Sequence, residues 1–571
     1  MEPRLSYIHA IRDYFDRILE DHTEMKALVL DLDTLATVSL VISQTEVLEK
    51  DVFFIETIEK LTIPKGSDRL SHLKAIIIVR PSEENLTQLK RALEYPKYDK
   101  FFIYFTNKIS EKALKELAEA DRSEVISSVI EIFSDISPVN HDLFTMNIPN
   151  VISLTNENVW GDNEKKLLGV IGEKLFAALL TMRKFPVIRF QNSSKRCQEL
   201  AYEVHRLLRE DPDLMAVRPG TGHKLTIENV DQSAVLLIID RREDPVTPLL
   251  HQWTYQAMLH ELLSIDNNKV QLKQYSGPER EVPLSCVQDD FYKEFMFSNF
   301  GDLSEGIKSL VMEFHGKQKV GQNVETIDDM KRFVNDYPEF SRIAGNVSKH
   351  VSLTSEIDIK IKKRMLLDVS ELEQDIACNE NKNEQYRKIL EILRDGRFNQ
   401  MDKLKLVLLF GLRYEGDDRI NQLIDGLRNA GIKDSELDLL DGVIKYAGRK
   451  KRSCDLFQNK NLIARAKYNF KMVMKDVPNV FIQHQSYLST VIDQTLKLKL
   501  RESEFPATAP FNPREGLTAL FVFVIGGTTY EEAKEVAMIN RNGGEATVLL
   551  GSNCIHNSVS FLAEIAQESI H

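Results

Sequence analysis

The sequence has few of the features that mark a metalloprotein, a disulfide-bonded protein or a membrane-spanning chain. Its 571 residues include only five cysteines, and no two of them form a CxxC pair. They are Cys197, Cys286, Cys378, Cys454 and Cys554. Scattered cysteines of odd number give no zinc signature and no disulfide framework, and they indicate reduced thiols in the cytosol. No apolar run reaches the roughly 18 residues of a membrane-spanning helix, so we expect any membrane role to depend on a partner.

Catalytic and phosphate-binding motifs are also missing. The sequence contains neither a GxxxxGK[ST] loop nor a GxSxG elbow. His251 and His260 fall on one predicted helix, but they are nine residues apart and cannot share a metal as the histidines of HExxH do. Gly526 and Gly527 join an apolar run to a predicted helix whose first turn carries two glutamates, which would repel an anion. We interpret them as a tight turn, and we expect no catalytic residue, no metal site and no cofactor.

The charge balance excludes another class of function. A formal net charge of −12 argues against a general nucleic-acid-binding protein, which would present a basic face. The N-terminal region shows no signal-peptide pattern, because Met1 to Glu20 has the apolar stripe of an amphipathic helix. We expect no nucleic-acid partner.

What the sequence does contain is a regular alternation of predicted strands and helices. Between Met1 and about Asp135 the predicted strands are Met25 to Leu30, Val52 to Ile55, Leu73 to Val79, Phe101 to Phe105 and Val125 to Phe133. Helical patterns separate several of these strands, as after Pro81 and from Ser110 to Ala120. This alternation is typical of an open, mostly parallel α/β sheet.

A second α/β block follows and is interrupted. Its clearest strand is Ala234 to Ile239, after which long helical patterns run from Pro248 to about Asn479. Strand patterns return at Ala519 to Ile525 and Thr547 to Leu550. We therefore predict that a large helical insertion splits the second sheet and that the C-terminal strands complete it.

The junction between that sheet and the insertion concentrates several signals. Ala234 to Ile239 is an unbroken apolar run, which suits a strand covered on both faces. A charged run from Asp240 to Asp244 follows, then Pro245 and Thr247. We predict that Thr247 caps a helix beginning at Pro248. The charged residues could be an acid–base pair, but without a second catalytic element a structural role is favoured.

One enzymatic alternative rests on Asp31 and Asp33, at the end of the first predicted strand in ALVLDLDTLAT. This arrangement resembles the DxDx motif of aspartate-based phosphotransferases, in which Asp31 would be the nucleophile, Asp33 the acid–base group and Mg²⁺ the cofactor. The later acidic pair that such chemistry needs is not evident. A helix cap after a strand is the favoured interpretation.

Long stretches resemble one known family. DRREDPVTPLLHQWTYQAMLHELL, FVFVIGGTTYEEA and KLVLLFGLRYE are similar to signature segments of the Sec/Munc (SM) proteins, which bind syntaxins and control SNARE-driven membrane fusion. RPSEENLTQLKRALEYPKYDKFFIYFTNKIS and NDYPEFSRIAGNVSKHVSL most resemble the vacuolar-protein-sorting branch of that family. The resemblance spans essentially the whole chain.

The resemblance implies a fold and a division of the chain. SM proteins are three-domain arches with two open, mostly parallel α/β sheet domains and a large, mainly helical insertion domain. Domain one would be residues 1–135, domain two would be 136–246 with 480–571, and domain three would be 247–479. The family has no established catalytic activity, so the chain is expected not to be an enzyme.

The resemblance also implies two partner-binding surfaces. Many members bind the N-terminal peptide of a syntaxin on domain one. Here Leu114 and Leu117 would form the apolar pocket and Glu131 its acidic rim, although periodicity alone would pack both leucines on the sheet.

The second surface is a helical hairpin that contacts SNARE helices. The matching segment contains Pro338, Phe340, Val351 and Leu353. Pro338 would bend or end a helix, and straightening there would expose Val351 and Leu353 to a vesicle SNARE.

The resemblance finally implies a role and a location. The expected partners are a trans-Golgi or endosomal syntaxin and its assembled SNARE complex, with a vesicle SNARE as a further candidate. The protein would be a monomer in the cytoplasm, peripherally associated with Golgi, trans-Golgi and endosomal membranes through SNAREs. Asp240, Arg241, Asp244, Pro245 and Thr247 would form an interdomain structural cluster. Besides the phosphatase, a tethering scaffold without SNARE specificity remains open.

Overall fold

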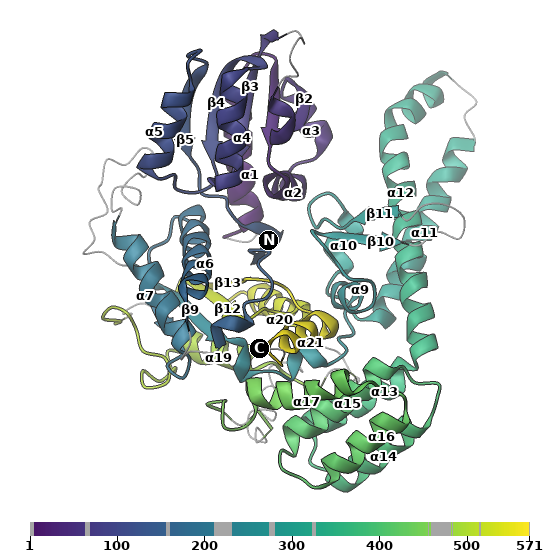
Figure 1. Cartoon of the computed structure of the whole chain (residues 1–571). Coiled ribbons are helices and arrows are strands. Elements are labelled where there is room, and N and C mark those ends of the chain that lie inside the picture. Colours follow the sequence, from purple (N-terminus) through teal and green to yellow (C-terminus); the bar gives the residue numbers. More distant parts are fainter. Residues whose placement is uncertain are drawn as a thin grey trace. The chain divides into compact units, whose positions relative to one another are not determined.

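The computed structural model describes residues 5–62, 69–155, 160–210, 231–272, 280–322, 327–454, 456–457, 481, 483–512 and 516–569. Within these ranges the chain forms two α/β sheets and a large helical region (Figure 1). This is the mixed α/β class with a helical insertion that the strand and helix patterns predicted. No helix in the described ranges is both long and apolar enough to span a bilayer.

The first sheet is fully parallel and has the order β2-β1-β3-β4-β5. Its strands are β1 (Lys26–Leu30), β2 (Val52–Thr57), β3 (Leu70–Val79), β4 (Tyr98–Phe105) and β5 (Ile126–Glu131). The accompanying helices are α1 (Tyr7–Glu20), α2 (Leu32–Val41), α3 (Gln44–Glu49), α4 (Glu83–Glu94) and α5 (Glu111–Ala120). Every residue of β1 is buried, as expected of a central strand covered on both faces. The predicted strands of this region are confirmed.

The second sheet joins segments far apart in the chain. Its order is β6-β7-β13-β12-β9-β8, parallel except for the β6–β7 pair. The strands are β6 (Ser137–Asn140), β7 (Leu143–Thr145), β8 (Pro186–Phe190), β9 (Asp231–Asp240), β12 (Ala519–Ile525) and β13 (Thr547–Ser552), with helices α6 (Asp162–Thr181) and α7 (Lys195–Glu210). Because β12 lies between β9 and β13, the C-terminal strands do complete the sheet begun before the insertion.

The helical region lies between β9 and β12 in the chain. It contains α9 (Tyr255–Leu263), α10 (Asp290–Phe295), α11 (Phe300–Gln322), α12 (Ile327–Arg364), α13 (Leu366–Cys378), α14 (Lys382–Arg394), α15 (Gln400–Arg413), α16 (Arg419–Asn429) and α17 (Asp434–Ala447). A two-stranded antiparallel sheet, β10 (Lys269–Leu272) with β11 (Arg280–Pro283), is part of the same region. The chain continues with α19 (Tyr487–Leu496), α20 (Tyr530–Arg541) and α21 (Ser558–Ser569).

The helix expected from Pro248 begins later. Thr247–Leu249 is a short 3-10 turn, and α9 begins at Tyr255. The Asp244 carboxylate accepts hydrogen bonds from the Thr247 amide at 2.9 Å and the Thr247 hydroxyl at 2.6 Å. Thr247 therefore donates its hydroxyl to Asp244 instead of capping a following helix, which corrects the sequence-based prediction.

The described chain packs into two compact units. Unit one consists of Met1–Asp240, Gln494–Gly527 and Val536–Cys554, and unit two consists of Arg241–Asp493, Thr528–Glu535 and Ile555–His571. Unit one holds both large sheets. The first crossing between units falls between Asp240 and Arg241, at the junction that the sequence pattern singled out. The division into three domains stays a prediction.

Candidate functional site

The first candidate surface lies on α5 and β5, at one edge of the first sheet (Figure 1). Leu114, on α5, is 43% exposed, whereas Leu117 is 1% exposed and belongs to the core beneath. Ile130, on β5, is 44% exposed and was not singled out from the sequence. The exposed apolar side chains of this edge are therefore Leu114 and Ile130, with Leu117 supporting α5 from below.

Glu131 has a defined local role at the same edge. Its Oε1 accepts a hydrogen bond of 2.8 Å from the amide of Ile109, in the loop between β4 and α5. Ser110 then caps α5 by accepting from the amide of Ala113 at 3.2 Å. Glu131 thus ties the end of β5 to the start of α5, the two elements that present the exposed leucine and isoleucine.

The second candidate surface is the hairpin of α11 and α12, which lie side by side (Figure 1). Helix α12 continues through Pro338 and Gly345, so Pro338 does not end a helix, and a bend there stays a prediction. The side chains of Pro338 and Phe340 lie outside the described part of the structure. Val351 is 40% exposed, and Leu353 is fully buried.

A buried hydrogen-bond network holds α12 at His350. The His350 ring, which is fully buried, lies 2.8 Å from the Tyr255 hydroxyl through Nδ1 and 2.9 Å from Asp289 Oδ2 through Nε2. Burial lowers the pKa of His350, although the bond to Asp289 opposes this shift. Lys349 also pairs with Asp289. These contacts hold the lower part of α12 against α9 and the start of α10, next to exposed Val351.

The predicted structural cluster is buried and divides between the two units. In unit one, Asp240 accepts from Arg196 Nε at 2.8 Å and Nη2 at 2.5 Å and from the Ser194 hydroxyl at 2.6 Å. The carboxylate ends strand β9 and anchors the start of α7. With both oxygens bonded inside the core, Asp240 has a structural role.

In unit two, Arg241 forms an ion pair with Glu532, in which Nη1 lies 2.8 Å from each carboxylate oxygen. Asp244 lies 3.6 Å from Arg241 and accepts from the amides of Val246 at 3.1 Å and Tyr487 at 3.0 Å. Burial alone would raise the pKa of Asp244, but Arg241 and the hydrogen bonds outweigh it and the pKa is lowered. Asp244 therefore remains ionised as a structural acceptor. Pro245, between the bonded residues, is buried like its neighbours.

One buried charge network had no signal in the sequence. Lys405, on α15, is fully buried, and its Nζ lies 3.3 Å from Glu261 and 3.6 Å from Glu373. His251 Nδ1 lies 2.9 Å from Glu373. Burial opposes the charge of Lys405, but the surrounding carboxylates outweigh it and raise its pKa. Burial would raise the pKa of Glu261, but Lys405, His251 and hydrogen bonds from Ser558 outweigh it and lower the pKa to about 2.

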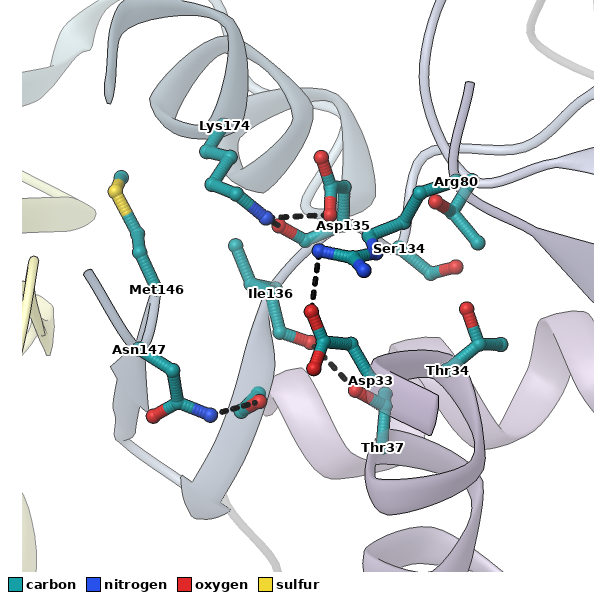
Figure 2. A pocket seen from close by; sticks show the side chains of 12 residues that line it. Asp33, Thr34, Thr37, Arg80, Ser134, Asp135, Ile136, Met146, Asn147 and Lys174 are labelled. Atoms are coloured by element: carbon teal, nitrogen blue, oxygen red, sulfur yellow. Dashed lines mark hydrogen bonds and ion pairs between the residues drawn. The ribbon is translucent and has the colours of Figure 1, made fainter. Parts of the chain in front are cut away.

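The phosphatase alternative is not supported. Asp31 accepts hydrogen bonds from the amides of Thr34 at 2.8 Å and Arg80 at 2.7 Å and from the side chain of Asn85 at 2.7 Å. Asp33 forms an ion pair with Arg80 beside a small pocket of about 20 Å³ (Figure 2). Asp31 is thus the N-cap of α2, and the pocket is too small for a phosphomonoester.

The tight turn at Gly526 and Gly527 is confirmed. Both residues have positive φ, 97° and 91°, which favours glycine. Their amides donate to Asn553 Oδ1 at 2.8 and 3.0 Å. These N–H groups are already bonded within unit one, so they do not form an anion site.

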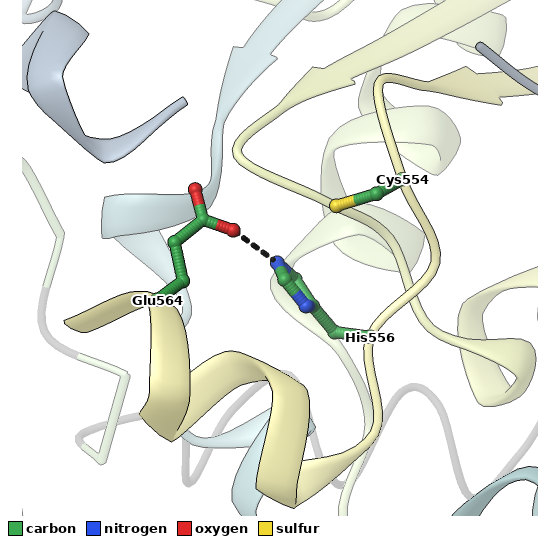
Figure 3. Close-up of side chains that lie close together, drawn as sticks. All are labelled: Cys554, His556 and Glu564. Carbon is green, nitrogen blue, oxygen red and sulfur yellow. Dashed lines mark ion pairs between the residues drawn. The ribbon is translucent and has the colours of Figure 1, made fainter. Parts of the chain in front are cut away.

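His556 and Glu564 are potential metal ligands that contact each other. His556 Nε2 lies 3.2 Å from Glu564 (Figure 3), and His556 Nδ1 lies 3.1 Å from the Ser560 hydroxyl. Both ring nitrogens therefore have protein partners. These contacts hold the start of α21.

The described residues form a mostly parallel α/β framework with a helical insertion, and the candidate binding residues Leu114, Ile130 and Val351 are exposed on it. The model described as the Sec1 family matches residues 26–564, and this chain belongs to that family.

Relatives and solved structures agree with this assignment. The chain is 39% identical to vacuolar protein sorting-associated protein 45 of Dictyostelium discoideum, with 99% of this chain and 98% of that protein covered. It is 37% identical to the Homo sapiens protein of the same name, covering 99% and 97%. A structure of the SM protein Vps45 in complex with the Qa SNARE Tlg2 matches with 35% identity, a TM-score of 0.88 and coverage of 99% and 98%. Sly1p in complex with an N-terminal peptide of Sed5p shares the fold, with 17% identity and a TM-score of 0.76.

Proposed function

We propose that this protein is an SM protein that binds a syntaxin and promotes or regulates SNARE complex assembly during vesicle docking and fusion. The observation that carries this proposal is the match over nearly the whole chain to Vps45, which was solved in complex with a Qa SNARE. A match of this extent includes the first sheet and the helical insertion, on which the two proposed binding surfaces lie. The role is regulatory rather than enzymatic.

The first binding surface is proposed to be the edge formed by α5 and β5. Exposed Leu114 and Ile130 supply apolar area for a short syntaxin N-terminal peptide. Leu117 supports α5 from the core, and Glu131 holds the loop before it. Glu131 would also supply the negative charge for a basic peptide residue at the rim. An edge of this kind suits a short peptide better than a folded domain.

The second binding surface is proposed to be the α11–α12 hairpin, with Pro338 and Phe340 on its distal part and Val351 nearer its base. Val351 is exposed on a helix whose base is fixed by the contacts of His350. A SNARE helix would pack its apolar face against this side of α12. Leu353 is buried and supports the hairpin from inside, so Val351 is the residue of the pair available to a partner.

The proposed place of action is the transport route between the trans-Golgi network, endosomes and the vacuole or lysosome. The names of the relatives, which are vacuolar protein sorting-associated proteins, support this location. The cognate partner would then be a syntaxin of those membranes, and the protein would reach the membrane through its SNAREs as a monomer.

The test compares full-length syntaxins from this route with the same proteins lacking their N-terminal peptides. We expect one syntaxin to bind and its affinity to fall at least several-fold when the peptide is removed. A tethering scaffold without SNARE specificity would bind equally with and without the peptide, or not at all. Absence of binding would contradict the proposal that the protein binds a syntaxin, and binding that does not depend on the peptide would contradict the α5–β5 surface.

A further inference from the structure

A basic pocket in unit two has no role in the proposed binding of syntaxin. It has a volume of about 320 Å³ and lies between the turn after α15 and the segment after α17. The pocket is lined by Lys382, Arg413, Tyr414, Arg449, Arg452 and Phe457, together with two acidic residues. Pockets that hold small molecules occupy roughly 300 to 1,000 Å³, so this one is large enough for a compact ligand.

The two acidic residues of the lining are already used. Asp417 forms an ion pair with Lys382 and accepts from the amide of Arg419 at 2.9 Å. Glu415 accepts from the amide of Arg449 at 2.6 Å. The acids therefore neutralise one lysine and fix the backbone of the arginine segment, while the three arginine side chains keep their charge.

Arg452 is the most unusual of these arginines. It is only 9% exposed, and its Nε and Nη1 are buried without a hydrogen-bond acceptor in the described structure. Its guanidinium lies 5.7 Å from the centre of the Phe457 ring, and that of Arg413 lies 4.9 Å from the same ring. A buried guanidinium without an acceptor is costly, because its charge has left water without gaining a counter-charge.

Arg413 and Arg449 complete the basic wall. Arg413 donates one hydrogen bond of 3.0 Å to the carbonyl of Ala377, which orients its guanidinium beside Phe457. The Arg449 side chain is exposed, and no ion pair restrains it among the described residues. The guanidinium of Arg413 is thus held in place, that of Arg452 has two buried nitrogens without an acceptor, and that of Arg449 is exposed at the pocket.

We propose that this pocket binds a small polyphosphorylated molecule, whose phosphate groups accept from Arg413, Arg449 and Arg452. Guanidinium groups match phosphate oxygens with paired hydrogen bonds, which is why arginine dominates such sites. The lining carries four basic side chains against two acidic ones, so the ligand needs at least two negative charges. The volume of about 320 Å³ suits a compact ligand of the size of an inositol phosphate, either free or as the headgroup of a lipid.

The test is titration calorimetry of the full chain with inositol trisphosphate at near-physiological salt, which suppresses weak surface binding. We expect one molecule to bind per chain and the affinity to fall at least tenfold in Arg449→Ala and in Arg452→Met. Lys451→Ala is the matched control, because Lys451 is exposed in the same segment but does not line the pocket. It should change the affinity less than twofold.

The melting temperature separates binding from folding. Arg452→Met should not lower it, since the variant removes a buried charge of which two nitrogens have no acceptor. Flotation with phosphatidylcholine vesicles, with and without phosphatidylinositol bisphosphate, identifies the source of the ligand. If the protein floats with the phosphatidylinositol bisphosphate vesicles and soluble inositol trisphosphate releases it, the ligand is a lipid headgroup. If the protein binds soluble inositol trisphosphate but does not float with the vesicles, the ligand is a free molecule.

Three outcomes of the inositol trisphosphate titrations would overturn the proposal. These are no binding of inositol trisphosphate, binding that persists in both arginine variants, and equal loss of binding in Lys451→Ala. Selective binding of a phosphoserine peptide that Arg449→Ala abolishes would overturn it too, because the pocket would then be a peptide site. Syntaxin binding by the same variants is expected to be unchanged, so this proposal and the proposed function can fail separately.

Discussion

Lys405 Nζ lies 3.3 Å from Glu261 Oε1 inside unit two, and both side chains are almost completely buried. Their segments are separated by more than a hundred residues of chain, and Glu373 adds a second carboxylate 3.6 Å from the same ammonium group. The buried ion pairs of Lys405 with Glu261 and Glu373 therefore connect α15 to α9 and α13.

Lys405→Met should strongly destabilise the protein. It leaves the carboxylates of Glu261 and Glu373 buried without their cation, a change that costs roughly 3–5 kcal/mol. Chemical denaturation with a probe in the helical region measures the loss. The double variant Lys405→Met with Glu373→Gln should recover part of it, because one uncompensated charge is removed as well. A stability equal to wild type for the single variant would refute this account of the network.

Glu535 gives a prediction for pH dependence. Burial, with Glu531 nearby, raises its pKa from 4.5 to about 8, and the carboxyl group accepts from the amide and hydroxyl of Ser486. Between these two pKa values the folded chain holds a proton that the unfolded chain has lost. The associated stability is therefore fully present below pH 4.5 and is lost as pH rises toward 8.

Glu535→Gln should remove this dependence, since a neutral amide replaces the carboxyl group. We expect the melting temperatures of variant and wild type to be similar near pH 5 and the variant to be more stable near pH 8. Thermal scans at several pH values measure the difference. A difference that stays constant across this range would show that Glu535 does not titrate in the way proposed.

Asp244→Asn should lower stability and partner binding together. The carboxylate accepts from three amides and one hydroxyl and compensates Arg241, whereas asparagine keeps the shape but loses the charge and one acceptor. The expected loss of unfolding free energy is on the order of 3 kcal/mol. Calorimetric melting and syntaxin binding should be measured on the same preparation. Weaker binding at an unchanged melting temperature would contradict the structural role of Asp244.

Leu114→Arg tests the peptide surface without disturbing the core. Leu114 is 43% exposed, so the variant should melt like wild type while losing at least several-fold affinity for the syntaxin N-terminal peptide. Leu48→Arg is the matched control, because Leu48 is 49% exposed on α3, which leads into the opposite edge strand β2. Equal binding by both variants would mean that the peptide site lies elsewhere. Leu117→Arg is a poorer test, since a buried charge would also destabilise the sheet.

Apolar runs identified the strands well, for a clear physical reason. Ala234 to Ile239 and Ala519 to Ile525 are unbroken because both faces of a central parallel strand are covered. Their pairing could also be anticipated, since an insertion that leaves a sheet has to return to it. The family resemblance then supplied the binding role, which composition and periodicity alone could not.

Contacts between distant segments explain what the sequence could not show. Thr247 has the residue type of a helix cap, but its hydroxyl donates to Asp244 instead. Asp244 is held in place by the amide of Tyr487, which is distant in the chain. Leu114 and Leu117 are three residues apart on one helix, and only the packing of α5 on the sheet decides which of them is exposed. Lys405 is a charged residue within an otherwise apolar stretch of α15. The sequence does not reveal why, because its partners Glu261 and Glu373 are far away in the chain.

The interrupted second sheet also bears on how the chain is made. Strand β9 ends at Asp240, but its neighbour β12 begins only at Ala519. While the ribosome synthesises the residues between them, one edge of the apolar strand β9 has no strand to pair with. An unpaired apolar edge is prone to aggregate. We therefore expect the nascent chain to depend on chaperones until its last strands emerge, and truncations before β12 to be insoluble rather than merely inactive.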